Sequence, residues 1–228
     1  MADITALENK IGYSFRNKAL LRTALTHSSF ANEHLLGREQ SNERLEFLGD
    51  SVLSLVVCDH LYRTFPASPE GELTVWRKNV VCREALTAYA QQIGLGEYLL
   101  LGRGEEKEGR EKPKILEDAF EALVGAIYLD SGSFETVEDF LLPFVHAELD
   151  KTQANPLDYK TLLQQYVQQT PGEELHYELL SEEGPDNAKI FTVCVKINSN
   201  IFGQGAGNSK KEAEQNAARE ALGRYLPK

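Results

Sequence analysis

The sequence has 228 residues, of which 42% are hydrophobic and 26% are charged, a balance that excludes a wholly disordered or fibrous chain. No apolar run approaches the roughly 20 residues of a membrane-spanning helix, so we predict no membrane association. The net charge of −11 argues against a nucleic-acid partner unless local features outweigh it, because phosphate binding favours clustered lysine and arginine.

The cysteines and the first residues indicate a reducing environment. Cys58, Cys82 and Cys194 are odd in number, and no Cys-x-x-Cys pair occurs, so the sequence predicts neither a disulfide framework nor a thiolate zinc site. The stretch 1–4 lacks the basic and apolar regions of a signal peptide. We therefore expect a cytoplasmic protein.

The first 150 residues carry a helical pattern almost throughout. Pro66 ends one helix and Pro113 stands where another can begin. No strand-like alternation interrupts this part, so we predict an all-α domain over 1–150 and a linker over 151–155. The expected helices lie at about 5–11, 17–26, 41–65, 73–79, 82–93, 114–131 and 134–148.

The remaining residues, 156–228, show a different pattern. An amphipathic helix is predicted over 156–169, where apolar residues recur at helical spacing. Alternating runs at 175–179 and 191–197 predict strands, and a turn leads into a third at 201–202. A helix over 209–225 closes the chain. The order α-β-β-β-α indicates a small α+β domain.

The predicted helix 41–65 carries acidic residues in an apolar setting. Glu43, Glu46 and Asp50 stand at positions i, i+3 and i+7 and share one face. Apolar residues surround every side of this helix, which predicts burial. An acidic stripe is ordinarily a solvated surface, but buried carboxylates are almost always paired or bound to metal. The apolar setting favours the second interpretation.

The helix 114–131 repeats this feature, with Asp118 and Glu121 at i and i+3 in an apolar segment. Two such helices would repel each other if they met, and a divalent cation would relieve the repulsion. Carboxylate ligands favour Mg²⁺, with Mn²⁺ as a substitute. A di-iron site needs Glu-x-x-His, which neither helix contains. Mg²⁺ held by carboxylates is suited to hydrolysing a phosphodiester.

The predicted last helix has positive charges at its N-terminus, where they are normally unfavourable. Ser209 and Glu212 form the pattern of a capping box, yet Lys210 and Lys211 occupy the first turn, where cations oppose the helix dipole. Two solvated lysines would be the plainer interpretation. A bound phosphate would also account for them, because the free backbone N–H groups point the same way.

The predicted helix 156–169 favours the interpretation in which Lys210 and Lys211 bind phosphate. Opposite its apolar stripe it presents uncharged polar side chains, which suit the 2′-hydroxyl groups in the shallow minor groove of RNA. Lysines of the last helix would suit the neighbouring phosphates. The predicted RNA-binding residues are Thr161, Gln164, Gln168, Lys210 and Lys211.

Several segments together resemble a known family. Residues 42–51, Asn-Glu-Arg-Leu-Glu-Phe-Leu-Gly-Asp-Ser, are similar to the signature of bacterial ribonuclease III, as are 26–29, 70–74 and 116–123. Residues 207–213 resemble the motif of the double-stranded RNA-binding domain. The resemblance covers nearly the whole chain and implies an all-α endonuclease domain followed by an α+β RNA-binding domain. Many such domains carry a lysine near 214, and Glu214 therefore predicts modest affinity.

The resemblance also implies residue roles. Glu46, Asp118 and Glu121 would bind Mg²⁺. Asp50 would hold metal or the attacking water, so that Asp50 and Glu121 are the expected catalytic residues. The remaining implied roles belong to Glu43 and Glu70, which would line the catalytic valley, and to Phe47, which would insert into a socket on a partner subunit. A plain core position for Phe47 is equally compatible with the sequence.

The implied activity is Mg²⁺-dependent hydrolysis of double-stranded RNA to 5′-phosphate and 3′-hydroxyl ends. A homodimer would cut both strands, and precursors of ribosomal RNA and structured messages would be substrates. Two alternatives stay open. One is a regulator that binds double-stranded RNA without cutting it, which the presence of all four carboxylates disfavours. The other is a DNA nuclease, against which the second domain argues.

Overall fold

The computed structural model describes residues 3–154, 158–168, 170–185 and 188–225. The chain forms two compact units, one of residues 1–64 and 76–151 and the other of residues 65–75 and 152–228. Residues 155–157, which include the predicted start of the second domain at 156, lie outside the described residues. No helix in the described part of the chain combines the length and apolar character needed to cross a membrane.

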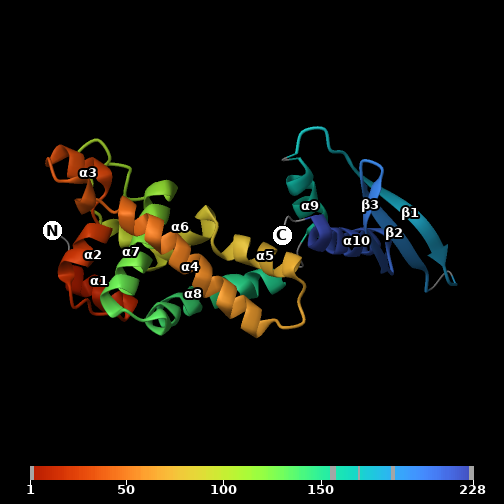
Figure 1. Cartoon of the computed structure of the whole chain (residues 1–228), viewed down its shortest axis with the longest axis horizontal. Helices are drawn as coiled ribbons and strands as arrows, with labels where there is room; N and C mark the ends of the chain where they lie inside the picture. Colours follow the sequence, from red (N-terminus) through yellow and green to blue (C-terminus); the bar gives the residue numbers. More distant parts are fainter. Residues whose placement is uncertain (1–2, 155–157, 169, 186–187, 226–228) are drawn as a thin grey trace. The chain divides into compact units, whose positions relative to one another are not determined.

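The first unit is helical, as predicted, and α4 lies beside α7 at its centre (Figure 1). Thr26 and Leu100 form an isolated bridge between two of its loops. The elements that precede α9 in the sequence are α1 (Ile4–Ile11), α2 (Lys18–Ala24), α3 (Ser28–Glu33), η1 (Arg38–Gln40), α4 (Glu43–Thr64), α5 (Glu70–Val80), α6 (Arg83–Gln92), η2 (Leu95–Tyr98), α7 (Pro113–Ser131) and α8 (Phe134–Ala154).

Aromatic side chains form the centre of this core. Phe120 of α7 is fully buried, and its ring centroid lies 5.6–5.8 Å from those of Tyr89, Phe140 and Phe144. Burying one such side chain stabilises the fold by about 1.5–3 kcal/mol. The contacts therefore join α6, α7 and α8 around Phe120.

The observed elements differ from the predicted ones in several places, which include the unpredicted short helices η1 and η2. The short helix α3 was not predicted; His27 caps its N-terminus by accepting the Ser29 N–H at Nδ1. Helix α8 continues to Ala154, so residues 151–154 of the expected linker are helical. The prediction that α4 is buried on every side is wrong, because Phe47, Leu55 and Tyr62 are exposed. The apolar residues of α4 cover the core and also part of the surface.

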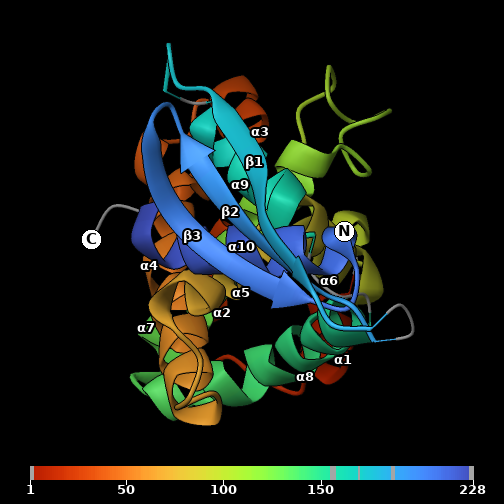
Figure 2. The same cartoon turned by 90° about the vertical axis from the view of Figure 1, so that its right-hand side faces the viewer.

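The second unit confirms the predicted α-β-β-β-α order. It contains α9 (Tyr159–Val167), β1 (Leu175–Glu183), β2 (Ile190–Ile197), β3 (Asn200–Gly207) and α10 (Lys210–Tyr225). The strands form one antiparallel sheet in the order β1-β2-β3. Figure 2 shows α9 and α10 on the same face of this sheet.

Small residues allow α10 to lie close to the sheet. A Cβ atom on Gly205 of β3 would stand 2.2 Å from the backbone nitrogen of Ala217, and one on Gly203 would stand 2.4 Å from the Ala217 carbonyl oxygen. The facing positions on α10, Ala213, Ala217 and Ala221, are fully buried. Close backbone approach therefore depends on glycine in the strand and alanine in the helix.

Candidate functional site

Two glycines bring α4 and α7 into backbone contact. A Cβ atom on Gly49 of α4 would lie 1.8 Å from the carbonyl oxygen of Glu121, and one on Gly125 of α7 would lie 2.5 Å from that of Leu45. Any other residue at these positions would force the helices apart. Because Gly49 lies between Glu46 and Asp50 in the sequence, the acidic face of α4 meets the acidic face of α7 at this crossing.

The crossing assembles three carboxylates, which we call the carboxylate cluster: Glu46, Asp118 and Glu121. One oxygen from each lies within 4.8 Å of the others. No other group of three His, Cys, Asp or Glu side chains in the described residues meets this criterion. Oxygen ligands on opposite sides of an octahedral Mg²⁺ are about 4.2 Å apart. Small side-chain movements would therefore fit these oxygens to a hard divalent cation.

The carboxylate cluster is electrostatically unfavourable by itself. Glu121 is only 9% exposed, and burial, followed by the charges of Asp50, Glu117, Glu46 and Asp118, raises its pKa to about 8. Burial and the charge of Asp118 also raise the pKa of Glu46. These shifts have the two expected physical causes, desolvation and like-charge repulsion. A bound cation would counteract both.

Three further side chains at the site were missed in the sequence. Lys114 Nζ donates to Asp118 Oδ1 at 2.6 Å and lies 3.9 Å from Glu46 Oε1. Glu117 lies 3.7 Å from the same ammonium and accepts a hydrogen bond from Arg83 Nε at 2.9 Å. The i,i+4 spacing of Lys114 and Asp118 was a visible signal. Arg83 comes from α6, and no local pattern could have found it.

The other acidic residues lie around or apart from the carboxylate cluster. Asp50 is exposed and is not one of its three members, but its charge contributes to the raised pKa of Glu121. Glu43, exposed in the first turn of α4, contributes to that of Glu46. Glu70 is exposed and accepts a hydrogen bond from Thr74 Oγ1 at 3.0 Å. It belongs to the segment 65–75, which is grouped with the second unit.

Phe47 is 79% exposed on α4, which excludes the alternative that it is a plain core residue of this chain. It borders a hollow of about 680 Å³ in the first unit. Apolar and charged side chains share this hollow, and Leu129 beside it is half exposed. The lining residues are Leu20, Thr23, Glu39, Glu43, Arg44, Leu45, Phe47, Leu48 and Leu129.

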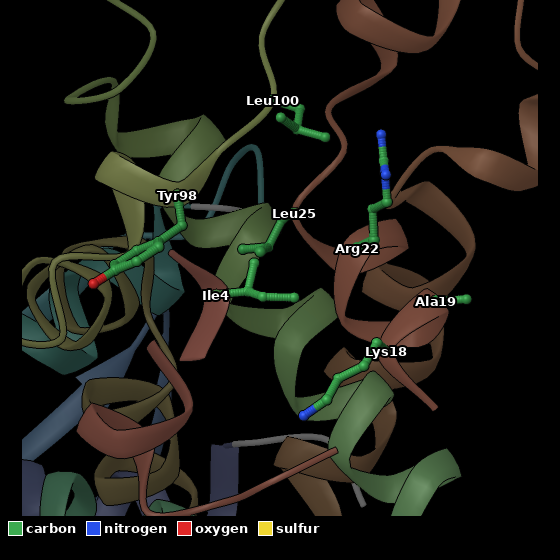
Figure 3. A pocket seen from close by; sticks show the side chains of 7 residues that line it. All are labelled: Ile4, Lys18, Ala19, Arg22, Leu25, Tyr98 and Leu100. Carbon is green, nitrogen blue, oxygen red and sulfur yellow. The ribbon is translucent and has the colours of Figure 1, made fainter. Parts of the chain in front are cut away.

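A second hollow in the first unit, of about 410 Å³, is mostly apolar (Figure 3). Ile4, Leu25, Tyr98 and Leu100 contribute to its walls. Lys18 also lines it, but its ammonium is paired with Glu8. None of its lining residues belongs to the carboxylate cluster, so this hollow has no part in the chemistry of that site.

The five predicted RNA-binding residues, which we call the polar face, are exposed in the second unit: Thr161, Gln164, Gln168, Lys210 and Lys211. The Thr161 hydroxyl donates to the N-cap residue Asp158 at 2.7 Å. Because this bond leaves the hydroxyl oxygen able to accept another, Thr161 can still meet a donor in solution.

The start of α10 is capped much as predicted. Ser209 Oγ accepts the Glu212 N–H at 3.1 Å, while the Glu212 carboxylate accepts the N–H of Asn208, one residue before the expected partner. Lys211 is exposed and Lys210 Nζ lies 5.8 Å from the centre of the Phe191 ring. Capping therefore satisfies some of the backbone N–H groups at the start of α10, and the ammonium groups of Lys210 and Lys211 stay in solvent.

Glu214 is neutralised within the unit. Lys160 Nζ of α9 donates to its carboxylate at 2.5 Å and also lies 4.8 Å from the centre of the Tyr177 ring. This ion pair joins α9 to α10. The negative charge of Glu214 is therefore offset locally, which weakens the reason for predicting modest RNA affinity from it.

Comparison with family models gives two matches. Residues 17–149 match the model described as ribonuclease-III-like, and residues 159–224 match that of the double-stranded RNA binding motif. The first match contains the whole carboxylate cluster, and the second contains the whole polar face.

Individual proteins agree with these models. The chain is 47% identical over 222 residues to a protein from Oceanobacillus iheyensis named Ribonuclease 3, with 96% of this chain and 97% of the relative covered. The nuclease domain of a Campylobacter jejuni ribonuclease III is similar at 39% identity and a TM-score of 0.58, covering 69% of this chain and 99% of that one. A second structure of that domain, at 40% identity and a TM-score of 0.58 over 64% of this chain and 98% of that one, is described as flexible in a region involved in dimer formation.

Proposed function

The chain belongs to the ribonuclease III family, and from this premise we propose that it is a Mg²⁺-dependent enzyme that cuts double-stranded RNA to 5′-phosphate and 3′-hydroxyl ends. It is a ribonuclease III-type endonuclease with a double-stranded RNA-binding domain. We propose domain boundaries of 1–150 and 156–228. The family supports metal dependence in general. The identity of the metal and the chemistry of the products are the parts that are proposed.

The carboxylate cluster is the single observation that carries the proposal. Three carboxylate oxygens lie within 4.8 Å of one another in a partly desolvated setting that disfavours their charge. Such an arrangement is costly without a counter-charge. Oxygen-only ligands favour Mg²⁺ or Mn²⁺ over softer ions. We assign Glu46, Asp118 and Glu121 as the ligands, with Asp50 completing the metal site.

The proposed reaction is an in-line displacement at phosphorus. The oxygen of a water molecule forms a bond to phosphorus, the bond from phosphorus to the 3′-oxygen breaks, and that oxygen takes a proton. A bound divalent cation would supply an acidified water and neutralise charge on the phosphate. Asp50 is exposed beside Glu121, so it can orient the incoming water and accept its proton. We therefore assign Asp50 and Glu121 as catalytic residues.

The surrounding charges have supporting roles in this proposal. Lys114 donates to Asp118 and offsets repulsion within the carboxylate cluster. Its ammonium would have to withdraw from that oxygen as the metal binds. Glu43, and Glu70 on α5, are proposed to line the catalytic valley outside the metal ligands, as the family resemblance implies.

RNA binding is assigned to the polar face. Thr161, Gln164 and Gln168 would contact 2′-hydroxyl groups in the minor groove, and the exposed ammonium groups of Lys210 and Lys211 would contact phosphates. These residues lie on α9 and at the start of α10, which pack on the same side of the sheet. Because Lys160 neutralises Glu214 locally, the negative charge of Glu214 is compatible with RNA binding at this surface.

A homodimer would place two carboxylate clusters on one duplex, one for each strand. Phe47, exposed at 79%, is proposed as the side chain that enters the partner subunit. The hollow of about 680 Å³ beside it is a suitable socket for the same residue of a second copy, because a two-fold axis pairs a surface with itself. Precursors of ribosomal RNA and structured messages are the proposed substrates.

The test is incubation of the protein with long double-stranded RNA, with Mg²⁺ and with a chelator. Gel analysis should show short duplexes with Mg²⁺ alone. The products should accept a 5′ label only after phosphatase treatment, and duplex DNA should stay intact. RNA that is bound but uncut at every Mg²⁺ concentration would support the non-cleaving regulator instead.

A further inference from the structure

Two histidines from different helices meet in the first unit, outside the carboxylate cluster. His60 lies near the end of α4, and His146 lies on α8. Their Nε2 atoms are 3.1 Å apart, and the ring centroids are 4.8 Å apart at an interplanar angle of 50°. His60 is half-buried and His146 is exposed. The same nitrogen of each ring therefore points at the other in a place that solvent can reach.

This geometry admits two chemical states. A neutral imidazole has one N–H and one lone pair. If one ring carries its proton on Nε2, it donates a hydrogen bond to the other ring. If both rings carry their protons on Nδ1, two lone pairs converge on one point. Because two facing lone pairs repel each other, this state is favourable only when a cation lies between them.

The separation fits a metal ion. Tetrahedral Zn²⁺ binds imidazole nitrogen at about 2.0–2.1 Å, which places two such nitrogens about 3.3 Å apart. The observed 3.1 Å differs from this by an amount that a small ring rotation supplies. The exposed side of His146 leaves room for water molecules to complete the coordination shell.

The surroundings of His60 keep its ring neutral near pH 7, which is the state that binds metal. The charges of Glu138 on α8 and Asp59 on α4 act on His60, and Asp59 also pairs with Arg63 at 2.7 Å. Burial and the neighbouring His146 lower the pKa of His60, so the ring is neutral and able to bind metal. No third Cys, His, Asp or Glu in the described residues offers a ligand atom within 4.8 Å of the pair. The protein therefore supplies two ligands.

We propose that His60 and His146 form a second metal site, which binds one Zn²⁺ between their Nε2 atoms and links the end of α4 to α8. Imidazole ligands select borderline transition metals, whereas the carboxylate cluster suits hard ions such as Mg²⁺. The two sites would then bind different metals at the same time. Zn²⁺ would stabilise the first unit, because it binds the folded state with both rings in place.

The experiment is Zn²⁺ titration of the full-length protein at pH 7.5 by calorimetry, with millimolar Mg²⁺ present to occupy the carboxylate cluster. We expect one Zn²⁺ per chain. Either His60→Gln or His146→Gln should lose that equivalent. His176→Gln removes an exposed histidine of the second unit and is the matched control, which should keep it. Equal binding by the wild type and both variants would overturn the proposal.

A measurement on the wild type keeps the proposal testable if a variant fails to fold. Nitrogen-15 NMR of the histidine rings should show both Nε2 resonances shifting on Zn²⁺ addition, with both Nδ1 atoms protonated in the Zn²⁺-bound state. Cu²⁺, which imidazole binds more tightly, gives a second spectrum, with electron-spin coupling to two equivalent nitrogens expected. Unshifted Nε2 resonances, or Cu²⁺ coupled to fewer than two nitrogens, would mean that the pair is only hydrogen-bonded.

Discussion

The carboxylate cluster and the polar face are built from opposite electrostatic arrangements. The cluster holds like charges close together, with Glu121 buried and its pKa raised to about 8. The polar face spreads Lys210 and Lys211 and uncharged groups over an exposed surface. Desolvation and repulsion act strongly in the first arrangement, whereas water and salt screen the second.

This difference separates chemistry from affinity. A group that must hold a metal and act on phosphorus has to be fixed and partly desolvated, so it lowers the stability of the metal-free fold. A side chain on the protein surface that contacts an RNA phosphate does not need to be fixed or desolvated in this way. We therefore expect substitutions in the carboxylate cluster to change catalysis and stability strongly, and those on the polar face to change binding moderately.

The largest effect is expected for Glu121→Gln. The amide keeps the size of the side chain but removes a charge that the metal needs. The rate of single-turnover cleavage should therefore fall by about three orders of magnitude or more, as when an enzyme loses a main group that stabilises its transition state electrostatically. RNA binding, measured by gel shift, should stay within a few-fold of the wild type. Glu135→Gln, an exposed carboxylate of α8, is the control. Wild-type turnover in the Glu121 variant would contradict the assigned site.

Phe47→Ala adds a third kind of surface to this comparison, the proposed dimer interface. If each Phe47 inserts into a partner, each loses about 1.5–3 kcal/mol of burial, and the dimer dissociation constant should rise at least about 100-fold. Sedimentation at low concentration measures this. Tyr62→Ala, also exposed on α4 at 74%, is the control. A dimer of unchanged affinity in the Phe47 variant would exclude the proposed insertion.

The stability of Glu121→Gln without metal tests whether the carboxylate cluster is costly. Removing a buried charge beside Asp118 and Glu46 should raise the free energy of unfolding by about 1–3 kcal/mol at pH 8 in chelator, since each unit of pKa shift corresponds to about 1.4 kcal/mol. Urea denaturation measures it. Glu135→Gln, an exposed carboxylate of α8 outside the carboxylate cluster, is the control and should not be stabilised. Equal destabilisation of both variants would show that the cluster is not under electrostatic strain.

Replacing both Lys210 and Lys211 with alanine should affect affinity only. Two phosphate contacts fewer should make the slope of log affinity against log salt shallower by about 2. Single-turnover cleavage at saturating RNA should stay nearly normal. Lys196→Ala, whose ammonium pairs with Glu178, is the control within the same unit. An unchanged slope would mean that these two lysines do not contact phosphate.

The smallest expected effect concerns the N-cap of α9. Hydrogen bonds from Gln215 and Thr161 lower the pKa of Asp158 to about 2, so its stabilisation is present above pH 4 and is lost as the pH falls towards 2. The exposed carboxylate is screened by solvent. Asp158→Asn should therefore cost about 1 kcal/mol or less at pH 7. Urea denaturation from pH 7 to pH 3 should show the difference shrinking, and a constant difference would contradict this origin.

The sequence predicted the local structure of both units well, because that structure depends on neighbouring residues. Helical spacing placed Glu46 and Asp50 on one face of α4, and Asp118 and Glu121 on one face of α7. The Ser209 and Glu212 pair predicted the start of α10. Alternation predicted β2 almost to the residue. The family motif added the expected roles of these residues.

Only the tertiary structure decided which side chains meet. The crossing of α4 and α7 depends on Gly49 and Gly125 contacting a backbone more than 70 residues away, and no local pattern encodes that contact. The same crossing brings in Lys114, and α6 contributes Arg83. The sequence also predicted that α4 is apolar on all sides and therefore buried. The fold leaves Phe47 exposed, because hydrophobicity determines that a side chain favours burial, while packing decides whether its own chain provides it.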